Sequence, residues 1–175
     1  MEPAVTDDRP DLTHQDPEGR ARMVDVTGKA DTARRAVARG RIRMSPGTLD
    51  AILEGRTDKG DALQVAELAG ILAGKRTGEL IPLCHVLPGT SVSVGLEPDP
   101  ELPGVRARAE ARYAGRTGVE MEALTAVSVA LLTVYDMAKA LDRGMVVEEV
   151  RLVRKEGGAS GLWVASDEQE SEEEG

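Results

Sequence analysis

The stretch from Thr117 to Arg143 constrains the fold most, because it has the pattern of a long and almost continuously apolar helix. Apolar residues recur in it at helical spacing, and further apolar residues occupy the positions between them. The recurring positions are Met121, Leu124, Val127, Leu131, Val134, Tyr135, Ala138 and Leu141. A helix of this kind is buried on more than one side, so we expect it to form the centre of the hydrophobic core.

Both ends of this helix carry charged residues that need an explanation. Glu120 and Glu122 stand at its beginning, while Asp136 and Lys139 stand near its end, three residues apart and therefore on neighbouring surface. The ordinary interpretation of the Asp/Lys pair is an ion pair at a helix end. The functional interpretation is a proton-transfer pair whose pKa values are shifted by burial and by mutual interaction. The pair alone does not decide between them.

The chain of 175 residues is long enough for one domain with a hydrophobic core. Its net charge of −9 comes from the ends, because residues 1–20 hold six acids and two bases and residues 165–175 hold six acids and no base. We therefore expect disordered acidic segments at 1–21 and 165–175 around a single domain at 22–164. This nearly neutral body, with two Tyr, one Trp and no Phe, argues against nucleic-acid binding.

Cysteine usage and hydropathy indicate the compartment. The single Cys84 excludes an internal disulfide and a multi-cysteine metal cluster. We find neither a run of about eighteen apolar residues nor a basic-then-apolar signal sequence. The sequence therefore predicts a cytoplasmic protein that does not interact with membranes.

The remaining elements follow from local patterns. We predict a short strand at 40–44, a helix at 46–55 that begins at Ser45-Pro46, and a second helix after Asp61. Leu63, Ala66, Leu68 (or Ala69) and Leu72 are expected to form the inward face of that second helix. Alternating strands are predicted at 91–97 and 105–113, and a last strand at 145–155. This β-α-β-β-α-β order is typical of a ferredoxin-like α+β sandwich with an antiparallel sheet, and the charged outer sheet face indicates an oligomer.

Three further regions contain candidate binding residues. Lys29 and the arginines of residues 34–41 are either a solvated basic segment or phosphate contacts. Lys59, in a glycine-containing loop before a helix, is either an ordinary exposed lysine or a phosphate contact beside outward-pointing N–H groups. Cys84 and His85 are adjacent in an apolar segment, and adjacent side chains of an extended chain point in opposite directions. We therefore prefer His85 as the ligand-binding group and Cys84 as lining.

Five motifs in order resemble the cyclic pyranopterin monophosphate synthase family, over about residues 22–164. They are MVDVT-x-K at 23–29, KGDAL at 59–63, AGILAGKRT-x-x-LIPLCH at 69–85, TGVEMEALTAVSVALLTVYDMAKAL at 117–141 and VRLVRKEGG-x-SG at 150–161. The resemblance implies a ferredoxin-like homohexamer, a trimer of dimers, with active sites between subunits.

The resemblance also implies an activity in molybdenum cofactor (molybdopterin) biosynthesis. The enzyme would be a lyase that converts (8S)-3′,8-cyclo-7,8-dihydroguanosine 5′-triphosphate to cyclic pyranopterin monophosphate and releases diphosphate. No redox cofactor is implied. A divalent cation could accompany the triphosphate, although no ligand cluster in the sequence requires a metal.

Specific residues match the motifs of this family. The implied catalytic residues are Asp136 and Lys139, with Lys59 assisting; the implied substrate-binding residues are Leu83, Cys84, His85, Met121, Glu122, Glu120, Arg34 and Lys155. Two positions depart from the family pattern, with Val86 in place of proline and Ala159 in place of lysine. Two alternatives remain: a regulatory ferredoxin-like module that binds a nucleotide without converting it, and a thiol enzyme that uses Cys84.

Overall fold

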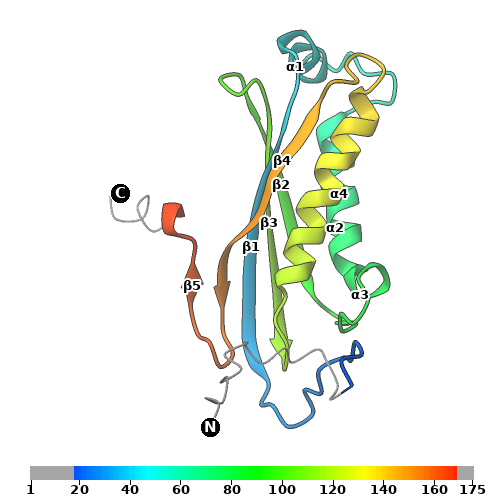
Figure 1. The fold of residues 1–175 in the computed structure, drawn as a ribbon. Coiled ribbons are helices and arrows are strands. Elements are labelled where there is room, and N and C mark those ends of the chain that lie inside the picture. The colour runs from blue at the N-terminus through cyan, green and yellow to red at the C-terminus, as the bar shows by residue number, and fades with distance from the viewer. Residues whose placement is uncertain (1–17, 169–175) are drawn as a thin grey trace, which may run out of the picture.

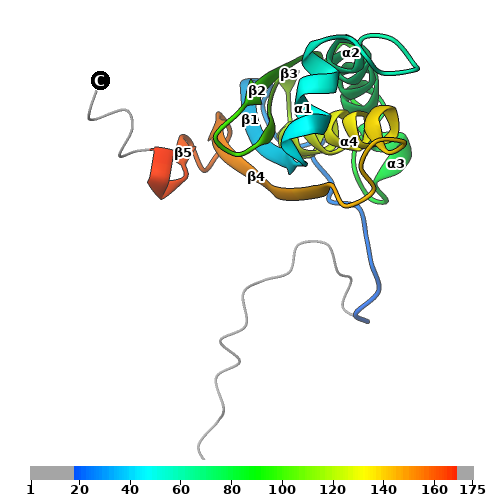
Figure 2. The same ribbon diagram turned by 90° about the horizontal axis from the view of Figure 1, so that it is seen from above.

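The computed structural model describes residues 18–168, which form an α+β domain with its helices on one face of an antiparallel sheet (Figure 1). The elements are β1 (Thr32–Arg43), α1 (Pro46–Leu53), α2 (Ala62–Lys75), α3 (Thr77–Leu80), β2 (Ser91–Asp99), β3 (Gly104–Gly115), α4 (Glu120–Ala138), β4 (Val146–Glu156) and β5 (Trp163–Val164). Figure 2 shows the helical layer against the sheet and the short β5 beyond it.

The sheet has the strand order β2-β3-β1-β4-β5, and every neighbouring pair is antiparallel. The first four strands have the arrangement of a ferredoxin-like sandwich, in which β1 lies between β3 and β4. The predicted fold class is therefore confirmed. The edge strand β5, which pairs with the end of β4 at Arg154 and Lys155, was not predicted.

β1 is much longer than the predicted strand at 40–44. It begins at Thr32 and pairs with β3 over its whole length and with β4 over most of it. Local pattern concealed this length because the buried positions are small residues, Ala36 and Ala38, interspersed with arginines. Pairing on both sides stabilises the strand, and the sheet alternation puts these alanines under the helices.

The two predicted helix starts are both correct but differ in their capping. Asp61 caps α2, because its carboxylate accepts hydrogen bonds from the backbone N–H groups of Leu63 and Gln64 at 3.0 Å each. Ser45 occupies the N-cap position of α1 without a hydrogen bond to the helix backbone. Its hydroxyl is instead 2.8 Å from the hydroxyl of Thr48.

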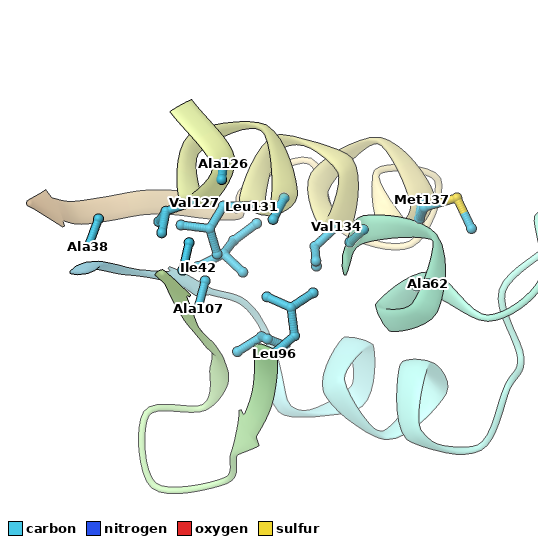
Figure 3. Close-up of a cluster of buried hydrophobic side chains, with 14 of the residues drawn as sticks. Ala38, Ile42, Ala62, Leu96, Ala107, Ala126, Val127, Leu131, Val134 and Met137 are labelled. Carbon is cyan, nitrogen blue, oxygen red and sulfur yellow. The ribbon is translucent and has the colours of Figure 1, made fainter. Parts of the chain in front are cut away.

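The core lies between α4 and the sheet, as the opening pattern of the sequence predicted. Val127, Leu131 and Val134 of α4 are fully buried, and they lie over Ile42 of β1 and Ala107 of β3 (Figure 3). Burying a leucine or valine side chain contributes about 1.5–3 kcal/mol. The domain therefore depends mainly on this layer for its stability.

α2 packs against α4 through small residues, so the predicted inward face of α2 was partly wrong. Leu68 and Leu72 are 59% and 49% exposed, whereas Ala66, Gly70 and Ala73 are buried. A Cβ atom on Gly70 would lie 2.7 Å from the carbonyl oxygen of Ala126, closer than such contacts allow. The two helices approach so closely that only alanine and glycine fit between them, which leaves the leucines on the outside.

α4 is the one helix among residues 18–168 whose length and composition would allow it to cross a membrane. Ten of its residues are buried inside the domain, and the helix contacts α2 and the four main strands. The same apolar character is expected of a core helix, and here its burial accounts for it.

The structure describes only the inner parts of the predicted acidic segments. Residues 1–17 and 169–175, which make up most of them, lie outside the described residues. Asp167 and Glu168 form ion pairs with Arg151 and Arg39 on the outer sheet face, beside the buried Ala165. The described chain thus remains in contact with the domain as far as residue 168.

Candidate active site

A cavity of about 490 Å³ opens at the end of the domain where α4 begins. Three segments that are distant in the sequence line it, namely residues 24–29, residues 81–87 and residues 117–122. Figure 1 shows that α3, which precedes the second of these segments, lies at this end of α4, whereas α1 lies at the opposite end. The volume suits a nucleotide-sized small molecule.

A strained turn presents the segment that contains Cys84 and His85. Pro82 and Leu83 are its central residues, and the Cys84 N–H donates to the Ile81 carbonyl oxygen at 3.2 Å. Leu83 has a φ of 64°, as in a type II turn, where this position favours glycine. Placing leucine there costs about 1 kcal/mol. The strain lies in the cavity wall, because Leu83, Cys84 and His85 all belong to the cavity lining.

The environment of Cys84 disfavours a thiolate. Burial raises the pKa of its thiol, and the nearby carboxylate of Glu122 raises that pKa further. A nucleophilic cysteine needs the opposite environment, with positive charge that lowers the pKa. The burial and the negative charge around Cys84 therefore argue against the thiol-enzyme alternative and in favour of Cys84 as lining.

Glu122 is the most unusual group of the cavity. Its side chain lines the wall, the residue is only 3% exposed, and its Oε2 atom is buried without a hydrogen-bond partner among the described residues. Burial is the main reason that the pKa of its carboxyl is raised, and the charge of Glu120 raises it further. A buried acceptor without a partner is costly, and a small shift of this side chain toward the N–H donors of a ligand would relieve that cost.

Positive charge lies beside the cavity. Lys29 is part of its lining, and the Lys155 ammonium is 3.7 Å from the carboxylate of Glu120, another lining residue. Arg34 and Lys155 lie on the helix-bearing face of the sheet, since both are in register with inward-facing positions of neighbouring strands. This end of the domain therefore combines an acid-lined cavity with cations suited to an anionic ligand.

Asp136, Lys139 and Lys59 form a second cluster. The Asp136 carboxylate accepts from the Lys59 ammonium at 2.6 Å and from the Lys139 ammonium at 2.7 Å. These two contacts hold the pKa of Asp136 at about 2, well below its ordinary value. The carboxyl is therefore ionised at neutral pH, and all three side chains are about half exposed.

Within one copy of the chain, the two clusters do not meet. Glu122 is in the first turn of α4 and Asp136 in its last turn, so the helix separates them by about 20 Å. The structure thus brings together Leu83, Cys84, His85, Glu120, Met121 and Glu122 around the cavity, and separately Lys59, Asp136 and Lys139.

Some cavity residues were not singled out from the sequence. Val24, Val26, Ile81 and Thr117 line the cavity, and no pattern in the sequence distinguishes them from ordinary apolar or loop residues. Among residues 18–168 there is no group of three or more His, Cys, Asp or Glu side chains placed to hold a metal ion.

The strand order and the cavity define a domain of the ferredoxin-like α+β class with room for a small-molecule ligand. The family model of the MoaC family matches residues 23–158, and the chain belongs to this family. Relatives from Brucella ovis and Brucella melitensis biotype 2, both named cyclic pyranopterin monophosphate synthase, are 60% identical over 156 residues. A relative of the same name from Brucella canis is 59% identical. Each alignment covers 89% of this chain and 94% of the relative.

Proposed function

We propose that this chain is the lyase that forms cyclic pyranopterin monophosphate in molybdenum cofactor biosynthesis. Its substrate is (8S)-3′,8-cyclo-7,8-dihydroguanosine 5′-triphosphate, and diphosphate is the second product. Membership of the family and 60% identity to relatives of that name support the activity. The structural observation that carries the proposal is a nucleotide-sized cavity whose lining includes Glu122, a buried acid with one carboxylate oxygen that has no hydrogen-bond partner among residues 18–168.

Glu122 binds the guanine-derived end of the substrate in this proposal. That end presents two N–H groups side by side, which match the two oxygens of an ionised carboxylate. The cavity also contains Met121 and Leu83, both about one-third exposed, as apolar surface for the fused rings. His85 completes this binding set as a hydrogen-bonding group on the same wall.

The triphosphate end requires fixed positive charge, because closing the cyclic phosphate expels an anionic diphosphate. Arg34 and Lys155 are the proposed cations on the cavity side, with Glu120 holding the Lys155 ammonium near the site. No redox cofactor takes part, because the conversion rearranges the substrate without net oxidation. A divalent cation bound to the triphosphate arrives with the substrate.

Asp136, Lys139 and Lys59 are the proposed proton-transfer residues. Opening the purine-derived ring and building the pyranopterin requires protons to move at nitrogen and carbon. In this proposal the two ammonium groups donate protons, and Asp136 accepts one after the substrate has displaced the lysine contacts that hold the pKa of Asp136 at about 2. Since these residues are about 20 Å from Glu122 of the same chain, a neighbouring subunit supplies them to each cavity.

Subunit association in a cytoplasmic homohexamer, a trimer of dimers, brings the two clusters together in this proposal. Val65, Leu68 and Leu72 form an exposed apolar row on α2, at the spacing of one helix face. Leu132 of α4 is also exposed. Such apolar helix surface supports burial against further copies.

The direct test incubates the purified protein with the cyclised triphosphate and measures diphosphate and the cyclic phosphate product. We expect wild type to release both, and Glu122→Gln to raise the KM with a smaller effect on kcat. Glu79→Gln is the control, since Glu79 is an acid of the neighbouring α3 that does not line this cavity. Binding of the triphosphate without release of diphosphate would instead identify the non-catalytic regulatory module.

A further inference from the structure

The loop that follows β4 holds Arg34 in place. Its residues Gly157 and Gly158 have φ values of 91° and 74°, a left-handed conformation that residues with a Cβ atom rarely adopt. A Cβ atom on Gly158 would lie 1.7 Å from Nη1 and 2.8 Å from Cζ of Arg34. The bare backbone of Gly158 is therefore in direct contact with the guanidinium group.

A second contact fixes the same guanidinium from β3. The Arg34 Nε–H donates to the Gly115 carbonyl oxygen at 3.2 Å. Among residues 18–168, the structure shows no hydrogen-bond or ion-pair partner for the two terminal nitrogens of Arg34. The neighbouring Arg35 contrasts with it, because both of its terminal nitrogens are bound by carboxylates, those of Glu156 and Glu110. Arg34 is thus held at its base and keeps its outer donors available for an anion.

We propose that Gly158 is a positioning residue, which keeps the guanidinium group of Arg34 oriented toward the phosphates of the substrate. The inference deepens the proposed function and rests on it, since the anion is the triphosphate of that substrate. A side chain at position 158 would occupy the place of Nη1 of Arg34 and turn the guanidinium group away from the phosphates. Only glycine combines the left-handed backbone with room for the guanidinium.

The proposal predicts that Gly158→Ala reproduces the loss of Arg34. Arg34 ends a flexible side chain, so the added methyl group moves the guanidinium and leaves the strands in place. We expect Gly158→Ala and Arg34→Ala each to weaken binding of inorganic diphosphate roughly tenfold, as the loss of a charged hydrogen-bonding group does. The KM for the triphosphate substrate should rise by a similar factor.

Gly161→Ala is the matched control. Gly161 lies in the same loop with a φ of 61°, and a Cβ atom there would meet nothing within 4 Å. The variant carries the same backbone penalty without the contact to Arg34. We expect its diphosphate affinity to equal that of wild type.

The decisive measurement is a double-mutant cycle by calorimetric titration with inorganic diphosphate. In the Arg34→Ala background, Gly158→Ala should have no further effect on affinity. Additive losses, an unchanged affinity in Gly158→Ala, or a wild type that does not bind diphosphate would each overturn the proposal. If Gly158→Ala does not fold, the double variant should fold, since the clashing group is gone; failure of both would also overturn it.

The titration separates this proposal from the proposed reaction. Diphosphate binding that depends on Gly158 through Arg34, in a protein that does not convert the cyclised triphosphate, would retain the positioning role and reject the reaction. Turnover of wild type together with an additive cycle would retain the reaction and reject the role of Gly158.

Discussion

Mixing two impaired variants, assayed at a substrate concentration well below the wild-type KM, tests whether one cavity uses residues of two subunits. Glu122→Gln removes the carboxylate of the cavity, and Asp136→Asn removes that of the second cluster. Asp136→Asn should lose about 10²- to 10⁴-fold in kcat/KM, the usual contribution of a proton-transfer group. Glu122→Gln should lose about 10- to 10²-fold, mainly through the KM, as the loss of a charged hydrogen-bonding group does. Because the two residues are about 20 Å apart in one chain, the proposed site takes Glu122 from one copy and Asp136 from another.

The size of the recovery follows from this geometry. In an equal mixture of the two variants, reassembled at random from dissociated subunits, each required residue is intact with a probability of one half. Roughly a quarter of the sites should then be complete, so diphosphate release should recover to roughly a quarter of the wild-type rate. A site built within one copy would show no recovery, because no chain in the mixture has both residues.

A second mixture provides the control. Lys59 and Asp136 are in contact within one chain, at 2.6 Å, so they belong to the same half of the proposed site. A mixture of Lys59→Ala and Asp136→Asn should therefore stay at the rate of the single variants. The reasoning is refuted if the first mixture does not recover while size-exclusion chromatography shows mixed oligomers, or if both mixtures recover equally.

Three further predictions concern stability and pH. Because the pKa of Glu122 is raised in the folded state, ionisation of Glu122 destabilises the fold as pH rises through that pKa. Glu122→Gln should therefore be more stable than wild type to urea at pH 7. Below the ordinary carboxyl pKa, the two proteins should have the same stability. Hydrogen bonds from Arg35 lower the pKa of Glu110 to about 2. The stabilisation of the fold by these bonds is therefore complete above the ordinary carboxyl pKa and is lost as pH falls toward 2. Glu110→Gln should make the urea midpoint depend less on pH between pH 5 and pH 3. Gly70→Ala should lose about 1–3 kcal/mol by forcing α2 away from α4, whereas Gly47→Ala, with nothing within 4 Å, should lose none by thermal unfolding.

Local patterns in the sequence were sufficient for the order of the four main strands and the three longer helices, but not for the short α3 and β5. The apolar spacing of residues 121–141 predicted α4, and the alternation at 105–113 predicted β3, because each pattern reflects burial of one face of the element itself. Asp61 predicted the start of α2 because a cap acts within three residues. The resemblance of the motifs to a known family added the candidate residues.

Only the tertiary structure determined the length of β1 and the outward position of Leu68 and Leu72. Pairing of β1 with two other strands, and the close approach of α2 to Ala126, depend on residues far away in the sequence. The separation of Glu122 from Asp136 is another feature that only the structure showed. Sequence motifs name both acids, but the rise of the helix puts them at opposite ends of the domain, so a single chain cannot bring them together.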